Sequence, residues 1–157
     1  MRRWAMVFAL LLALTTLSAC GRAKEDDRLI SWYGAEKAGE LGVACTDEAQ
    51  LAVAEELAEK ARALLLHAEP MGEAELSACG ELSRYYELDP DADHADAACR
   101  VLTTKQEGGA GYVWVSYSAT YYSRSGEVRS GFSERISRWD IQQRDGQWVV
   151  TGIDEMP

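Results

Sequence analysis

The sequence predicts an α+β fold, in which N-terminal helices pack on a curved antiparallel sheet of about four strands. Two stretches between residues 46 and 87 carry apolar side chains at the spacing of amphipathic helices. From residue 100 onward, runs rich in β-branched and aromatic residues alternate with turn signals that contain glycine. A length of 157 residues with 47% apolar content suits one domain built around one core.

The first helix is predicted to begin with Thr46 as its N-cap and to end before Pro70. Asp47 and Glu48 follow in the first turn, where the helix dipole favours negative charge. The apolar positions of this helix share one face: Val53, Leu57, Ala61, Leu64 and Leu65. A second helix is predicted over residues 73–87 and folds back on the first, with one face formed by Leu76, Cys79, Leu82 and Tyr86.

Four strands are predicted over residues 100–105, 112–123, 128–142 and 148–155. The dipeptide Asp145-Gly146 between the last two is the strongest hairpin signal of the chain. In the third strand, a β-bulge between Ile136 and Trp139 is predicted, because it brings four apolar residues to the core side: Phe132, Ile136, Trp139 and Ile141. Such a bulge bends the sheet.

Two helices followed by a bent antiparallel sheet resemble the NTF2-like superfamily, with cystatin-like folds as neighbours. The residues that carry the resemblance are Tyr112 to Tyr122, Gly126, Trp139-Asp140-Ile141, Asp145-Gly146, Trp148-Val149-Val150, Ile153 and Glu155. The resemblance covers residues 45–157 and implies a half-cone of sheet cradled by helices. It also implies that some relatives are enzymes, such as steroid isomerases and dehydratases, which place Asp, Tyr or His inside the cone.

The N-terminus resembles the signal peptide of bacterial lipoproteins. Arg2 and Arg3 precede an apolar run over residues 4–14, which is too short to span a bilayer of about 30 Å with ordinary flanks. The segment Leu17-Ser18-Ala19-Cys20-Gly21 then matches a lipobox, which implies a diacylglyceryl group on Cys20 and cleavage before it. We therefore predict a signal peptide (1–19), a tether (20–44) and one domain (45–157), anchored by lipid to a membrane of the cell envelope and facing outside the cytoplasm.

The charge of the chain is acidic and unevenly distributed. The formal net charge is −10, and residues 36–96 contain 16 acidic and 4 basic side chains, whereas residues 97–157 contain seven of each. Nucleic-acid binders depend on Lys and Arg that neutralise phosphates, so we expect no nucleic-acid partner. This difference in charge between the two halves of the chain also agrees with one helical layer followed by one sheet layer.

Three cysteines remain besides Cys20, and an oxidising compartment allows one disulfide among them. A helical hairpin that turns near Pro70 places Cys45 about 35 Å and Cys79 about 14 Å from the turn, which disfavours that pair. Cys79 and Cys99 are the disulfide candidates. The alternative is that Cys45, Cys79 and Cys99 all remain reduced and serve as small buried hydrophobic residues.

The acidic run from Asp89 to Asp96 resembles the start of an EF-hand loop. His94 stands where the loop needs glycine, however, and Arg100 stands where it needs a bidentate glutamate. A weak Ca²⁺ site is therefore an alternative to a solvated acidic connection. Hydrolase motifs are absent from the sequence, and we predict no catalytic residue, no metal site and no cofactor.

The leading functional hypothesis is a lipid-anchored, extracytoplasmic binding or accessory module without catalysis, whose partner is an unknown protein or small molecule. Aromatic side chains give large contact areas, so the candidates for ligand binding on the concave sheet face are Tyr112, Trp114, Tyr122, Trp139 and Trp148. Two alternatives stay open. One is a weak Ca²⁺-binding surface protein, and the other is an NTF2-like enzyme with an acid/base site in the cone, formed among Tyr112, Tyr117, Tyr121, Tyr122 and Asp140.

Overall fold

The computed structural model describes residues 27–67, 69–86 and 91–156, which fall into two compact units divided between Gly42 and Val43. In the first unit residues 27–40 are helical, in a stretch for which the sequence predicted only a tether. The predicted leader and the predicted lipidation site, Cys20, lie outside the described residues. Within the described part of the chain, no helix combines the length and the apolar character needed to cross a membrane.

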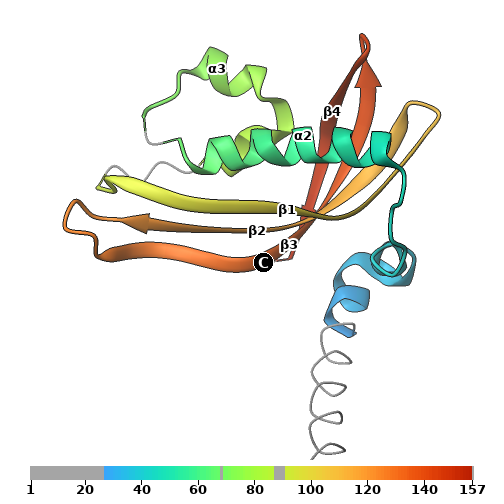
Figure 1. Cartoon of the computed structure of the whole chain (residues 1–157), viewed down its shortest axis with the longest axis horizontal. Helices are drawn as coiled ribbons and strands as arrows, with labels where there is room; N and C mark the ends of the chain where they lie inside the picture. The colour runs from blue at the N-terminus through green and yellow to red at the C-terminus, as the bar shows by residue number, and fades with distance from the viewer. Residues whose placement is uncertain (1–26, 68, 87–90, 157) are drawn as a thin grey trace, which may run out of the picture. The chain divides into compact units, whose positions relative to one another are not determined.

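The second unit is an α+β fold, which confirms the predicted fold class. Its elements are α2 (Glu48–Leu65), α3 (Glu73–Ala78), the 3-10 helix η1 (Gly80–Tyr85), β1 (His94–Glu107), β2 (Ala110–Tyr122), β3 (Val128–Arg144) and β4 (Gln147–Glu155). The strands form one antiparallel sheet in the order β1-β2-β3-β4, which is curved and unclosed, with α2 lying across one face (Figure 1). Strands β1 and β4 are therefore its edges.

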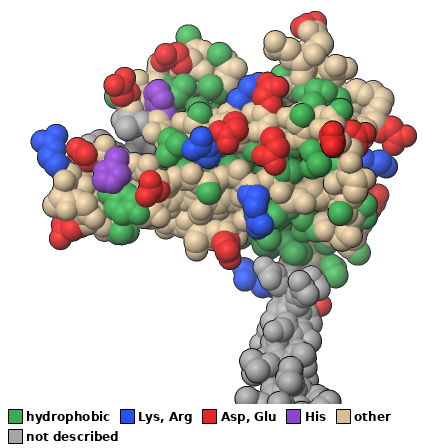
Figure 2. All heavy atoms as spheres, viewed as in Figure 1, with side chains coloured by type: hydrophobic (Ala, Val, Ile, Leu, Met, Phe, Trp, Pro, Cys, Tyr) green, Lys and Arg blue, Asp and Glu red, His purple; other side chains and the backbone are tan. Residues whose placement is uncertain are grey.

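Helix α2 is capped by Asp47, one residue later than predicted. The Asp47 carboxylate accepts hydrogen bonds from the backbone N–H of Ala49 at 2.9 Å and of Gln50 at 3.1 Å. The predicted apolar face is buried, and α2 packs chiefly against β1. Its exposed positions include four acidic residues: Glu48, Glu55, Glu56 and Glu59. Acidic side chains, red in Figure 2, are spread over the face of the molecule seen there.

The second predicted helix is broken in two. Helix α3 ends at Ala78, and η1 begins at Gly80, whose φ of 57° is left-handed and is best tolerated by glycine. The break turns Leu82 and Tyr85 of η1 into the core. Arg84 of η1 also reaches the outer strand of the sheet, since its Nη1 donates to the carbonyl oxygen of Ile153 in β4 at 3.1 Å.

The core lies between the helices and one face of the sheet. Odd-numbered residues of β2 face it, and they pack with Trp139 and Ile141 of β3 and Val150 of β4. The turn between β3 and β4 has positive φ at Asp145 (51°) and Gly146 (80°), as a two-residue hairpin of the predicted kind requires. Strand β1 starts at His94, six residues before its predicted start.

The bulge predicted between Ile136 and Trp139 is absent, because β2 and β3 pair regularly there, and a bulge lies instead before Arg135. The register of β2 and β3 shifts between the pairs Tyr117–Arg135 and Ala119–Phe132, and Glu134 there has a φ of 52°. Phe132 therefore packs against the core, whereas Ile136 pairs with Ser116 on the other face of the sheet. The prediction that all four apolar residues of β3 lie on the core side was wrong for Ile136.

Candidate functional site

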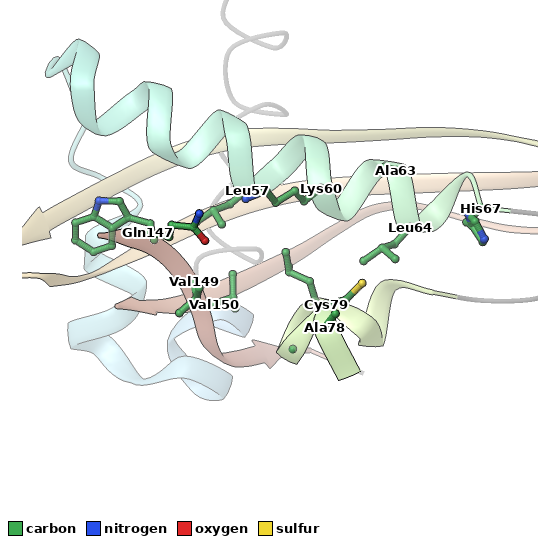
Figure 3. A pocket seen from close by; sticks show the side chains of 13 residues that line it. Leu57, Lys60, Ala63, Leu64, His67, Ala78, Cys79, Gln147, Val149 and Val150 are labelled. Carbon is green, nitrogen blue, oxygen red and sulfur yellow. The ribbon is translucent and has the colours of Figure 1, made fainter. Parts of the chain in front are cut away.

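A pocket of about 460 Å³ lies between α2, the corner that joins α3 to η1, and β4 (Figure 3). Its walls are mainly apolar: Leu57, Ala63, Leu64, Ala78, Cys79, Gly80, Leu82, Trp148, Val149 and Val150. The remaining side chains are polar, with Gln147 at one end and His67 at the other, and Lys60 along α2. We call this space the α2–β4 pocket.

The local sequence explains each wall of the α2–β4 pocket. Leu57 and Leu64 are seven residues apart, so they lie two turns apart on one side of α2. The glycine break at Gly80 keeps α3 from continuing as one helix over this face, so that Ala78 and Cys79 border the space. A second space of about 240 Å³ shares Leu57, Lys60, Gln147 and Trp148 and adds Val53, Glu56 and Gly146. Together the two form a groove beside α2.

Two of the polar residues that line the pocket, Lys60 and His67, contact neighbouring side chains. Lys60 Nζ lies 2.7 Å from Glu56 Oε1, and both side chains are more than half exposed, so this ion pair adds little to stability. The His67 ring lies 5.9 Å from the ring of Tyr86. The Tyr86 hydroxyl in turn donates to the carbonyl oxygen of Glu69 and accepts from the N–H of Met71, which fixes the chain after α2. Apolar walls with such polar ends suit binding of an amphipathic molecule.

A second constellation lies on the core side of the sheet, and we call it the tyrosine cluster: Tyr85, Tyr117, Arg135, Ser137, Trp139 and Glu155. Tyr85 is its centre. Trp139 Nε1 donates to Tyr85 Oη at 2.7 Å, Ser137 Oγ lies 3.1 Å from the same oxygen, and Tyr85 Oη donates to Glu155 Oε1 at 2.8 Å. The Tyr117 ring packs edge-on against Tyr85 with 4.9 Å between centroids.

Both tyrosine hydroxyls are neutral hydrogen-bond donors at ordinary pH. Burial raises the pKa of Tyr85 and of Tyr117 well above the usual value, and the negative charge of Glu155 raises each further. Arg135 lies beside the Tyr117 hydroxyl and opposes this shift in its pKa. The Arg135 guanidinium also stacks over Phe132, 4.6 Å from the ring centroid. The bulge at Glu134 is what brings Arg135 opposite Tyr117.

The five aromatic candidates for ligand binding do not come together. Trp148 lines the α2–β4 pocket, whereas Trp139 is 0% exposed and lies in the core and the tyrosine cluster. Tyr112, Trp114 and Tyr122 lie on the face of β2 that points away from the core. Tyr122 stacks on His94 there at 4.8 Å, and Arg138 lies over Tyr112 at 5.1 Å. A concave recognition surface made of all five is therefore not what the structure has.

The residues predicted for an acid/base site are also divided. Tyr117 and Tyr121 face the core, but Asp140 is exposed and pairs with Arg138. The carboxylate that does face tyrosines is Glu155, which the sequence analysis did not single out. No sequence pattern pairs Glu155 with a tyrosine, because Glu155 is the last residue of β4 and the tyrosine that it contacts, Tyr85, belongs to η1, far away in the sequence.

The two cysteines predicted to form a disulfide, Cys79 and Cys99, are both free and partly buried. Cys79 lines the α2–β4 pocket beside Leu57 and Leu64. Burial, with smaller contributions from the charges of Glu55 and Glu59, raises the pKa of the Cys99 thiol to about 12. The structure does not join this pair.

The acidic stretch after residue 90 is engaged in ion pairs. Asp91 lies 3.1 Å from Arg129, and Asp93 lies 3.3 Å from Arg124. Among residues 27–67, 69–86 and 91–156, no three His, Cys, Asp or Glu side chains are grouped as metal ligands. Asp89 lies outside these ranges. Through these ion pairs, the residues just before β1 contact the turn between β2 and β3 and the start of β3.

Comparisons of the chain with protein-family models, curated proteins and solved structures find no match. The fold and the sites define an α+β protein that has an apolar pocket between α2 and β4 and a tyrosine cluster on the core side of its sheet. Function is inferred from these two sites.

Proposed function

We propose that this protein is a lipid-anchored, extracytoplasmic binding module of the NTF2-like type, which holds a small amphipathic molecule in the α2–β4 pocket and catalyses no reaction. The observation that carries the proposal is the pocket itself. Its volume of about 460 Å³ falls within the roughly 300–1,000 Å³ of ordinary ligand sites, and its mainly apolar walls carry a polar residue at each end, Gln147 and His67.

The size of the apolar part of the ligand follows from the energetics of burial. Each buried CH₂ group contributes about 0.8 kcal/mol. Association costs at least about 4 kcal/mol because the ligand loses translational and rotational freedom. A micromolar dissociation constant corresponds to a binding free energy of about 8 kcal/mol. About fifteen buried carbons therefore provide such an affinity. Leu57 and Leu64 lie about 10 Å apart along α2, and the pocket continues to His67 beyond the end of the helix, which gives an elongated molecule room to lie there.

The lipobox supports the location that we propose. An acylated Cys20 holds the second unit near a membrane surface, where amphipathic molecules are concentrated. A binding module in that position exchanges such molecules between the membrane and its own pocket.

Filling the pocket is expected to abolish binding. Ala63 lines the pocket on α2 and is exposed, so Ala63→Trp introduces an indole into the space without disturbing the core. With the neutral fluorescent probe N-phenyl-1-naphthylamine, we expect saturable binding to the wild-type chain and at least tenfold weaker binding to this variant. The measurement is a titration followed by the fluorescence of the directly excited probe.

The matched control for this test is Ala52→Trp. Ala52 is also exposed on α2, three turns before Ala63, and does not line the α2–β4 pocket. Its variant is expected to bind the probe as the wild type does. Equal losses in both variants, or no saturable binding to the wild type, contradict the proposed function.

Lipidation is tested by Cys20→Ala. The thiol of Cys20 is the only group to which a lipobox directs a diacylglyceryl chain, so cells that express this variant are expected to incorporate no labelled palmitate into the protein. Cys45→Ala is the control and is expected to retain full labelling. Persistent labelling of the Cys20→Ala chain, seen after electrophoresis and confirmed by mass spectrometry, argues against the anchor.

A further inference from the structure

We infer that the tyrosine cluster is a second binding site, that it takes a carboxylate group, and that the protein's own Glu155 occupies it in this structure. None of its residues lines the α2–β4 pocket. The inference therefore stands apart from the proposed function.

The cluster presents hydrogen-bond donors that converge on one carboxylate. Tyr85 Oη donates to Glu155 Oε1 at 2.8 Å, and the Tyr117 hydroxyl lies beside the same carboxylate. Arg135 adds a positive charge next to Tyr117. An ionised carboxylate accepts hydrogen bonds through both oxygens, and bonds to a charged acceptor are about twice as strong as neutral ones. This arrangement matches a carboxylate better than a neutral acceptor.

The donors are fixed by the core and not by Glu155. Tyr85 is 3% exposed and is held by Trp139 Nε1 at 2.7 Å and by ring contacts with Tyr117 and Trp139. Arg135 is positioned by the bulge, where Glu134 adopts a left-handed φ that costs a non-glycine residue free energy. Bulges of this kind often re-aim a side chain beside a functional site. Without Glu155 the Tyr85 hydroxyl keeps the neutral Ser137 Oγ, 3.1 Å away, in place of a charged acceptor, so a carboxylate in the place of Glu155 stabilises the cluster.

Glu155 can exchange with a second carboxylate. It is the last residue of β4, an edge strand, and it forms the terminal pair of the β3–β4 ladder with Ser137. Ends of edge strands open most readily. The Glu155 side chain is partly exposed and Arg135 is exposed, so an incoming carboxylate approaches from solvent along the guanidinium. Such a carboxylate comes either from a small organic acid or from the Glu or Asp side chain of a protein partner.

The experiment uses the Glu155→Ala variant of the whole chain. Sodium acetate at 1–100 mM is expected to raise its melting temperature saturably, by about 2–4 °C, because the acid replaces the missing side chain. Sodium chloride at the same ionic strength is the control. The wild type and Glu155→Gln are expected not to respond, since a side chain that accepts hydrogen bonds already fills the site. The double variant Glu155→Ala/Tyr117→Phe is expected to lose most of the response.

Two further arms complete the test. Glu155→Asp shortens the side chain by one carbon and keeps the charge, so it provides a folded variant with a partly vacated site if Glu155→Ala does not fold. Blocked glutamate is then tested in place of acetate, because it carries the side chain of a protein glutamate. A stronger response to blocked glutamate than to acetate favours the side chain of a protein partner as the ligand, and an equal response favours small organic acids. The inference is overturned if neither Glu155→Ala nor Glu155→Asp responds to acetate or to blocked glutamate, or if Glu155→Gln responds equally.

Discussion

Replacing Trp139 with alanine is expected to lower the free energy of unfolding by about 3–5 kcal/mol, which is the usual loss for a large aromatic side chain in a core. Trp139 is 0% exposed, its ring lies 5.6 Å from the ring of Tyr85, and its Nε1 donates to Tyr85 Oη at 2.7 Å. The variant therefore creates a cavity and also removes a donor from the tyrosine cluster. Urea denaturation followed by circular dichroism measures the loss.

Two control variants separate these effects. Trp139→Phe keeps a ring in the core and removes the N–H, so we expect a loss of about 1–2 kcal/mol. Val128→Ala changes an apolar residue on the same strand that is 66% exposed, and its expected effect is below about 0.5 kcal/mol. A Trp139→Ala variant no less stable than Val128→Ala would mean that this side chain is not packed as described.

Replacing Gly111 with alanine is expected to destabilise the sheet by about 3 kcal/mol, although alanine normally suits a strand better than glycine. A Cβ atom at this position would lie 2.1 Å from the carbonyl oxygen of Lys105 and 2.9 Å from the Cα of Gln106. Both are backbone atoms of β1, so the two strands must separate at the hairpin that joins them. Thermal melting and urea denaturation both report the loss.

Gly152→Ala is the matched control for this variant. Gly152 also lies in a strand, but its nearest neighbour is the carboxylate oxygen Oδ2 of Asp140 at 3.4 Å, on an exposed side chain that can rotate away. We expect a change of less than about 1 kcal/mol. If the two alanine variants had equal stability, the close approach of β1 and β2 at Gly111 would be refuted.

The sequence predicted the fold class because its strongest signals are local. Asp145-Gly146 forms the expected turn, and the apolar face of α2 is the one buried. The early start of β1 was missed, because the residues that face the core there, Ala95 and Ala97, are small and their exposed neighbours include a third alanine, Ala98, beside His94 and Asp96. A short alternation of alanine with charge gives little periodicity to recognise.

The sites were harder to predict because they depend on how segments that are distant in the sequence pack against one another. The four apolar residues of β3 required a bulge, but periodicity did not say on which side of Ile136 it falls. Its actual place at Glu134 moved Ile136 out of the core and Arg135 into the tyrosine cluster. Likewise, Gly80 was not recognised as a helix break, and this break brings Tyr85 to the sheet and leaves Cys79 beside the α2–β4 pocket.

The contact from Arg84 to the carbonyl oxygen of Ile153 has a consequence for how copies of the protein meet. An open outer strand offers its backbone groups to any neighbouring chain, which is a common start of aggregation. Here a guanidinium already occupies one of those acceptors. A molecule that extended the sheet along β4 would first have to displace Arg84 from this carbonyl.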